Sequence, residues 1–126
     1  MGKQTPLFDI SALSQAANVS TRTIRYYGEL GLLPATERGP GGRRLYSEDA
    51  LERLRFISRL KHLGLSLSEI GELNDRFSSG ATPAMLEQLD QLLEVRISQV
   101  TERISELSKL VDELDSYRQR INDKIS

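Results

Sequence analysis

The chain has 126 residues, no cysteine and a formal net charge of −1 at pH 7, and 38% of its residues are hydrophobic. The lack of cysteine excludes disulfides, thiol redox sensing and cysteine-based metal sites. Residues 1–8 lack the apolar run of a signal peptide, and no apolar stretch is long enough to span a bilayer. We therefore expect a cytoplasmic protein that has no membrane partner.

The small net charge conceals a division along the chain. Residues 1–62 carry ten Lys or Arg and six Asp or Glu, whereas residues 63–126 carry seven and twelve. This asymmetry is expected when only one end of a protein binds a polyanion. No nucleophile motif and no phosphate-binding loop after a strand is present, and His62 has no cysteine or carboxylate cluster beside it. We therefore expect no enzymatic activity, no metal and no cofactor.

Two short helices joined by a tight turn are predicted after an N-terminal tail of residues 1–8. The first helix spans residues 9–17 and stops at Asn18, a residue type that tolerates the left-handed conformation. Ser20 is a good N-cap for the second helix, which we expect to stop at Gly31. This pattern is typical of a helix-turn-helix.

The second helix has two different faces. Arg22, Arg25 and Tyr26 share one side at helical spacing, whereas Ile24 and Tyr27 share another. The apolar side can hold the helix in a core while the arginines face a nucleic-acid groove, and we interpret Tyr27 as core. The predicted DNA contacts on this helix are Thr21, Arg22, Thr23, Arg25 and Tyr26.

A glycine-rich loop between two extended arms follows. Leu32–Thr36 and Arg43–Tyr46 are the predicted arms, and residues 39–42 are the predicted tip. An ordinary connecting loop is one interpretation. Three arginines in one short segment favour the other, a wing that binds the DNA backbone, because they repel each other without an anion. These arginines are Arg38, Arg43 and Arg44, of which the last two are the predicted phosphate contacts.

Two further helices should complete the small domain. Ser47 caps the first, and Tyr46 with Leu51 fits a hydrophobic staple at its start. Tyr46 is equally a candidate phosphate ligand, and both roles can coexist. This helix ends at Gly64, and residues 66–69 form a capping box for the next helix. The predicted inward residues are Leu51, Leu54, Ile57 and Leu60, then Leu67, Ile70, Leu73 and Phe77.

The last element should be one long helix from Thr82–Pro83 to Ile125, about 64 Å at 1.5 Å per residue. Its apolar residues follow a heptad pattern, although Arg118 occupies a seam position and the step from Leu93 to Ile97 breaks strict register. A small domain cannot cover so long an apolar stripe, so the same helix of a second copy should cover it. The heptads allow the two helices to pair either parallel or antiparallel. The predicted dimer interface contains Leu93, Ile97, Val100, Ile104, Leu107, Val111, Leu114 and Ile121.

Four linked motifs occur in order at residues 19–27, 31–34, 42–47 and 63–70. Through them the chain resembles the mercury-resistance regulator (MerR) family of bacterial transcription factors over roughly residues 8 to 77. The resemblance implies a homodimer with antiparallel long helices, bound to a pseudo-palindromic promoter element in the bacterial nucleoid together with RNA polymerase. It also implies activation by bending and untwisting an overlong promoter spacer.

The expected fold is therefore all-α with a small β wing. Residues 9–80 form a winged helix-turn-helix domain, and residues 81–126 form an antiparallel coiled-coil dimerisation helix. Gly28 departs from the acidic residue common in the family and should loosen the end of its helix. The chain resembles a short member without a C-terminal metal loop or drug-binding domain, and no particular inducer is predicted. The alternatives are an inducer-independent repressor or architectural protein, and a coiled-coil module whose winged domain binds a protein.

Overall fold

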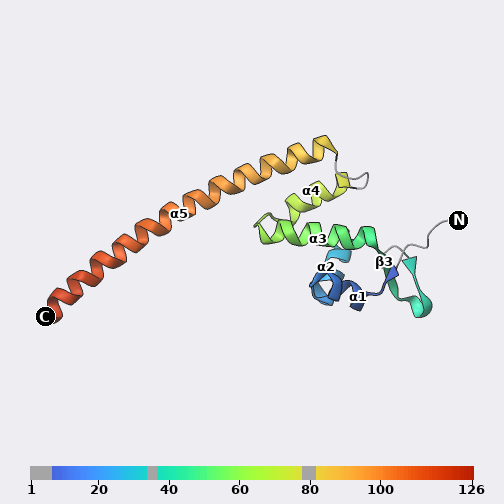
Figure 1. The fold of residues 1–126 in the computed structure, drawn as a ribbon, viewed down its shortest axis with the longest axis horizontal. Coiled ribbons are helices and arrows are strands. Elements are labelled where there is room, and N and C mark those ends of the chain that lie inside the picture. The colour runs from blue at the N-terminus through green and yellow to red at the C-terminus, as the bar shows by residue number, and fades with distance from the viewer. Residues whose placement is uncertain (1–6, 34–36, 78–81) are drawn as a thin grey trace. The chain divides into compact units, whose positions relative to one another are not determined.

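The structure is a computed structural model in which residues 7–33, 37–77 and 82–126 are described. The chain divides into two compact units, Met1–Ala81 and Thr82–Ser126. The described residues of the first unit form four α-helices and a small sheet, and those of the second form a single helix (Figure 1). In chain order the elements are β1 (Leu7–Phe8), α1 (Ile10–Ala17), α2 (Thr21–Glu29), β2 (Glu37–Arg38), a 3-10 turn (Pro40–Gly42), β3 (Arg44–Ser47), α3 (Glu48–His62), α4 (Leu67–Phe77) and α5 (Pro83–Ile125).

The predicted helix-turn-helix is formed by α1 and α2. Asn18 ends α1 in the left-handed conformation, with φ of 55°, as predicted. In the turn, the Val19 N–H donates to the Ser14 carbonyl at 3.2 Å, and Ser14 Oγ donates to the Val19 carbonyl at 2.6 Å. Ser20 caps α2 and Gly31, with φ of 75°, follows its end. The helix continues through Gly28 to Glu29, and the expected loosening of its end by that glycine stays a prediction.

The wing is a three-stranded antiparallel sheet with β3 in the centre. Of the predicted arm Leu32–Thr36, Leu32 and Leu33 are not part of a strand, and the strand that pairs with β3 is β2. Leu32 and Leu33 are both buried, and the Leu32 N–H closes the end of α2 by donating to the Tyr27 carbonyl. These leucines therefore belong to the helix end and the core. Residues 34–36 of the predicted arm lie outside the described residues.

The third strand, β1, comes from a segment that the sequence analysis assigned to the N-terminal tail. Leu7 pairs with Ser47, and Phe8 pairs with Tyr46. A strand of two residues is too short for an alternating pattern to reveal it, and its partner lies almost forty positions later. The pairing ties the start of the chain to the base of the wing.

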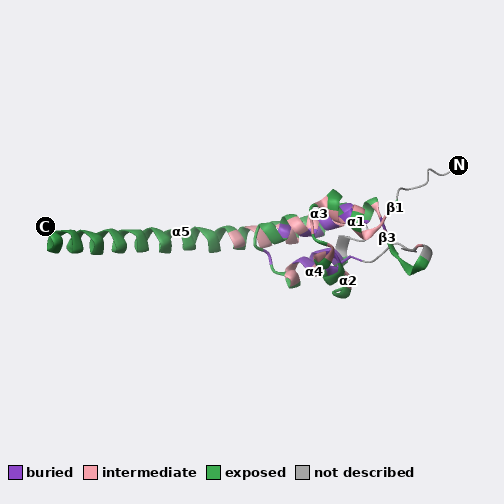
Figure 2. Cartoon of the chain, turned by 90° about the horizontal axis from the view of Figure 1, so that it is seen from below, coloured by how far each residue is buried: buried purple, intermediate pink, exposed green. Residues whose placement is uncertain are grey.

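The core of the first unit lies among α1 to α4, and α3 contacts both α1 and α4 (Figures 1 and 2). All four predicted inward residues of α3 are buried, as are Ile70 and Leu73 of α4, whereas Leu67 is only half-buried. The predicted capping box is present, because the Ser66 N–H donates to Glu69 Oε1 at 2.9 Å and the Glu69 N–H donates to Ser66 Oγ at 3.1 Å. The side chain of Phe77 lies outside the described part.

Asn74 is a buried polar residue that the sequence analysis did not single out. Only 4% of its surface is exposed, and its Nδ2 donates to the Leu32 carbonyl at 3.0 Å. The bond joins α4 to the segment directly after α2. Because buried carbonyl groups need a donor, this amide stabilises the position of the chain where it leaves the helix.

The second unit is α5, a helix of 43 residues with the predicted bounds. Thr82 caps it by accepting the Met85 N–H at 3.2 Å, and Pro83 occupies its first turn. From residue 97 onward every residue is exposed within the single chain, and Figure 2 shows this exposure continuing to the C-terminal end.

Replacing Asn74 by Ala should lower the free energy of unfolding by about 1–3 kcal/mol, because the buried Leu32 carbonyl loses its donor. Urea denaturation at one fixed protein concentration measures this change. Ser68→Ala, at an exposed position of the same helix, is the control and should shift stability by less than about 0.5 kcal/mol. Equal stability of both variants would show that the amide contributes nothing.

Candidate nucleic-acid interface

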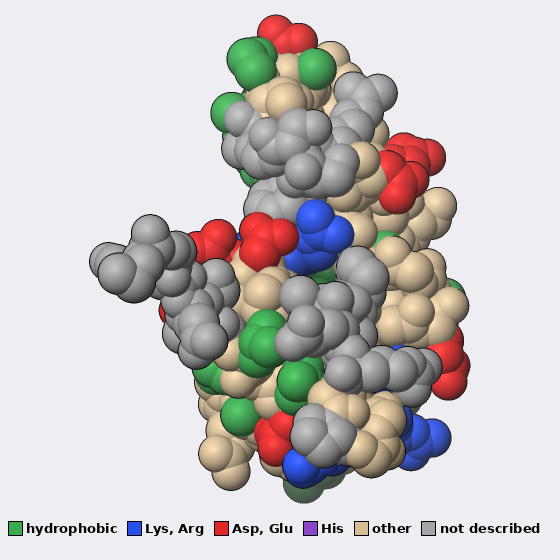
Figure 3. Space-filling model, turned by 90° about the vertical axis from the view of Figure 1, so that its right-hand side faces the viewer, with side chains coloured by type: hydrophobic (Ala, Val, Ile, Leu, Met, Phe, Trp, Pro, Cys, Tyr) green, Lys and Arg blue, Asp and Glu red, His purple; other side chains and the backbone are tan. Residues whose placement is uncertain are grey.

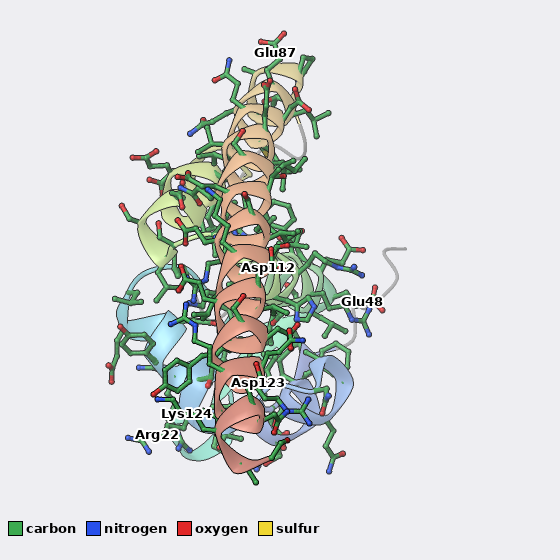
Figure 4. All side chains as sticks on the ribbon, turned by 90° about the vertical axis from the view of Figure 1, so that its left-hand side faces the viewer. Arg22, Glu48, Glu87, Asp112, Asp123 and Lys124 are labelled. Carbon is green, nitrogen blue, oxygen red and sulfur yellow. The ribbon has the colours of Figure 1, made fainter. Side chains whose placement is uncertain are left out.

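Helix α2 is held by its apolar side. Ile24 and Tyr27 are buried, whereas Arg22, Arg25 and Tyr26 are exposed. This is the division of faces that the spacing predicted, and it confirms Tyr27 as a core residue. Arg22 points away from the ribbon of α2 (Figure 4). The arginines are thus available to a ligand while the helix itself is fixed.

The start of α2 is fixed by two hydrogen bonds between Ser20 and Thr23. The Thr23 N–H donates to Ser20 Oγ at 3.1 Å, and Ser20 Oγ donates to Thr23 Oγ1 at 2.8 Å. Thr21 and Thr23 are half-buried, so they present less surface to a partner than the arginines do.

Tyr26 and Tyr27 are neighbours with different environments. Their ring centroids lie 6.3 Å apart at an interplanar angle of 43°. Burial, and to a smaller extent the charge of Tyr26, raises the pKa of the Tyr27 hydroxyl above its ordinary value. Tyr27 is therefore neutral at physiological pH, whereas the exposed Tyr26 ring is free to contact a ligand.

The wing turns sharply at the Pro40–Gly42 turn. Gly41 and Gly42 have φ of 74° and 77°, a backbone region that other residues enter only with strain. At the base of the turn, the Gly39 N–H donates to the Arg43 carbonyl at 2.6 Å. Arg43 and Arg44 are exposed on the returning strand. In the register of the sheet, Arg38 lies opposite Arg44.

A cavity of about 480 Å³ is lined by residues of both α2 and the wing. Arg25 lines it from the helix, and Arg43 and Arg44 line it from the wing, together with the carboxylates of Asp9 and Glu29. Within the described part of the chain, none of these three arginines forms an ion pair. Three cations against two carboxylates leave a local excess of positive charge, which favours an anion such as a phosphate. On the face seen in Figure 3, Lys and Arg side chains lie in several separate places beside acidic ones.

The structure divides the predicted DNA contacts into two groups. Four of them line this cavity, namely Arg25, Arg43, Arg44 and Tyr46. The other four, Thr21, Arg22, Thr23 and Tyr26, do not line it and lie elsewhere on α2. Tyr46 is only 1% exposed and pairs with Phe8, so its burial supports the staple role, and phosphate binding stays a prediction. The sequence analysis missed Asp9 and Glu29. The position of Glu29 four residues after Arg25 on α2 was a signal that could have found it, whereas Asp9 approaches the arginines only in the folded domain.

A second surface runs along α5. Seven of the eight predicted dimer residues are exposed in the single chain, with exposed fractions that include 66% for Ile97 and 63% for Ile104, whereas Leu93 is half-buried. Leu110 and Tyr117 are exposed as well and were not predicted. An exposed ion pair joins Arg103 Nη1 to Glu106 Oε2 at 3.1 Å. Figure 4 shows polar side chains such as Asp112, Asp123 and Lys124 on the same helix.

Sequence profiles of two domain families match the chain. The profile described as MerR HTH family regulatory protein matches residues 8–76, and the profile described as MerR, DNA binding matches residues 51–117.

Among the residues described, no cluster of His, Cys, Asp and Glu side chains could hold a metal ion.

Individual proteins match over most of the chain. A ZntR homologue of Haemophilus influenzae, described as an HTH-type transcriptional regulator, is 37% identical over 88% of this chain and 81% of its own. The lead(II) complex of PbrR691, a transcription regulator of Ralstonia metallidurans, has a TM-score of 0.72 and 34% identity, covering 89% of this chain and 86% of that one. HiNmlR, a regulator lacking the sensor domain and solved bound to promoter DNA, has a TM-score of 0.63 and 27% identity, covering 85% and 80%. The predicted winged helix-turn-helix followed by a long helix is thereby confirmed.

Proposed function

The chain belongs to the MerR family of DNA-binding transcriptional regulators, and from this premise we propose that it binds a two-fold promoter element as a homodimer. The observation that carries the proposal is the set of exposed arginines on α2 and the wing. Three of them, Arg25, Arg43 and Arg44, line one cavity and form no ion pair with a described residue. A relative solved on promoter DNA supports the same mode of binding. The protein acts in the bacterial cytoplasm, at the nucleoid when bound.

The recognition helix enters the major groove in this proposal. Arg22 and Arg25 contact base edges or phosphates there, and Tyr26 donates to a phosphate. Thr21 and Thr23 lie in the first turn of the helix and contact the backbone near its N-terminus. Arg43 and Arg44 bind phosphates from the wing, which adds affinity more than sequence specificity. Tyr46 stabilises the wing through its burial and its pairing with Phe8.

The apolar stripe of α5 pairs with the same stripe of a second copy. Exposed apolar residues recur at three- and four-residue steps from Ile97 to Ile121, as in a coiled-coil seam. So long an exposed apolar surface is unusual for a monomer, and a helix of this length is stabilised mainly by packing. The pairing is antiparallel, as the family resemblance implies, and it gives the dimer the two-fold symmetry of its DNA element.

The regulated step is a change in DNA shape. A dimer that bends and untwists an overlong spacer realigns the two promoter elements read by RNA polymerase, which makes transcription possible without new base contacts. The alternative is a repressor that binds the same element and blocks polymerase. Activation and repression differ in their dependence on spacer length, because only activation by this mechanism requires an overlong spacer.

The double variant Arg22→Ala, Arg25→Ala should lose specific binding by at least about tenfold while remaining dimeric, because each lost base contact costs about 1–3 kcal/mol. Footprinting on the upstream region and gel shift measure the binding, and light scattering measures the mass. Glu29→Ala on the same helix removes a carboxylate that repels phosphate, and it should not weaken binding. Loss of the dimer in the double variant would assign the arginines a structural role.

Ile104→Asp should convert the dimer to a monomer, because it places a charge in the apolar seam. The adjacent Ser105→Asp puts the same charge outside the stripe and should stay dimeric. Sedimentation equilibrium distinguishes the two masses. An Ile104→Asp protein that remains a dimer would remove the stripe from the interface.

Transcription in vitro tests the sign of regulation. On the bound promoter, the protein should raise transcription when the spacer is overlong and should have little or no activating effect after its shortening by about two base pairs, a change that rotates the promoter elements relative to each other. The level of the promoter transcript from purified polymerase is the readout. Lowered transcription on both templates would identify a repressor.

A further inference from the structure

Gly28 lies inside the recognition helix, where glycine is among the weakest helix formers. Its φ is not positive, so the backbone at this position does not require glycine. A Cβ atom at residue 28 would lie 3.4 Å from Arg44 Nη1 and 3.7 Å from the Leu33 carbonyl oxygen. Both distances are ordinary van der Waals contacts, so alanine would fit. Steric hindrance therefore does not explain why residue 28 is a glycine.

The 3.4 Å distance shows that Arg44 of the wing lies close to α2. Arg44 comes from β3, yet its guanidinium group lies beside the position that a Cβ on Gly28 of α2 would occupy. It shares the cavity wall with Arg25 and Arg43, and it forms no ion pair with any described residue, the cavity carboxylate of Glu29 included. An acidic side chain at position 28 would reach this guanidinium directly.

We propose that the missing side chain at position 28 keeps Arg44 available to DNA phosphate, so that this position sets the affinity for DNA and its salt dependence. An acidic residue there would form a charge-assisted pair with Arg44, and DNA would then have to displace it. Each phosphate contact that is lost removes about one unit from the slope of log affinity against log salt. The inference rests on the proposed contact between Arg44 and phosphate.

The test compares Gly28→Glu with Gly28→Gln, which has the same shape without the charge. Each substitution is made in the wild-type chain and in an Arg44→Ala chain. Binding of a fluorescent mixed-sequence DNA duplex is measured by anisotropy between about 50 and 200 mM salt, since phosphate contacts do not depend on sequence. Circular dichroism checks that each variant keeps its helical content, and Gly28→Asp replaces the glutamate variant if that protein does not fold.

We expect Gly28→Glu to weaken binding roughly tenfold and to reduce the salt slope by about one unit for each subunit, as loss of one charged contact would. A dimer loses two such contacts and should therefore bind roughly a hundredfold more weakly, with a slope smaller by about two units. Gly28→Gln should bind within about threefold of wild type, a difference well below that of a charged contact. In the Arg44→Ala chain, Gly28→Glu should cause little further loss, because its partner is gone.

Three results would overturn the inference while leaving DNA binding in place. One is an equal loss with glutamine, which would indicate a steric effect. Another is an equal loss from Gly28→Glu in the Arg44→Ala chain, which would indicate direct repulsion of the DNA. The third is wild-type binding by Arg44→Ala itself. If the wild-type chain does not bind the duplex, the same salt titration is made on the footprinted promoter fragment. Failure to bind that fragment as well would overturn the proposed function and the inference with it.

Discussion

The interface depends on the packing of one side of a nine-residue helix. Ile24 and Tyr27 fix α2 in the core, and only because they do so can Arg22 and Arg25 face outward in a constant direction. The helix ends are equally constrained, by the Ser20 cap at the start and by the closure before Gly31 at the end. The apolar contacts thus provide the rigidity that charged contacts to DNA require, since flexible arginines lose more entropy when they bind.

The wing and the helix form one charged surface although they are distant in sequence. Arg44 rests against α2, while β1 and β2 hold both sides of β3. The Asn74 amide fixes the chain as it leaves α2, through its hydrogen bond to the Leu32 carbonyl. Strand pairing and one buried hydrogen bond therefore set the distance between the two groups of arginines, and a small change in either would alter the shape offered to DNA.

Most of the fold could be predicted from residues whose effects are local. The Ser66–Glu69 capping box, the stop at Asn18 and the bounds of α5 follow from interactions within four residues. Features that depend on strand pairing were missed, such as β1 and β2. In the site, residue types identified the arginines, but the cavity formed with Asp9 and Glu29 arises only when the wing folds back.

The exposed stripe on α5 has a consequence for how the regulator responds to its own abundance. If two chains must meet before either stripe is covered, the number of molecules able to occupy a two-fold site rises with the square of the chain concentration while pairing is incomplete. A modest change in synthesis or degradation would then produce a larger change in promoter occupancy. The exposed stripe of one helix would in this way make promoter occupancy depend more steeply on chain concentration, without any ligand.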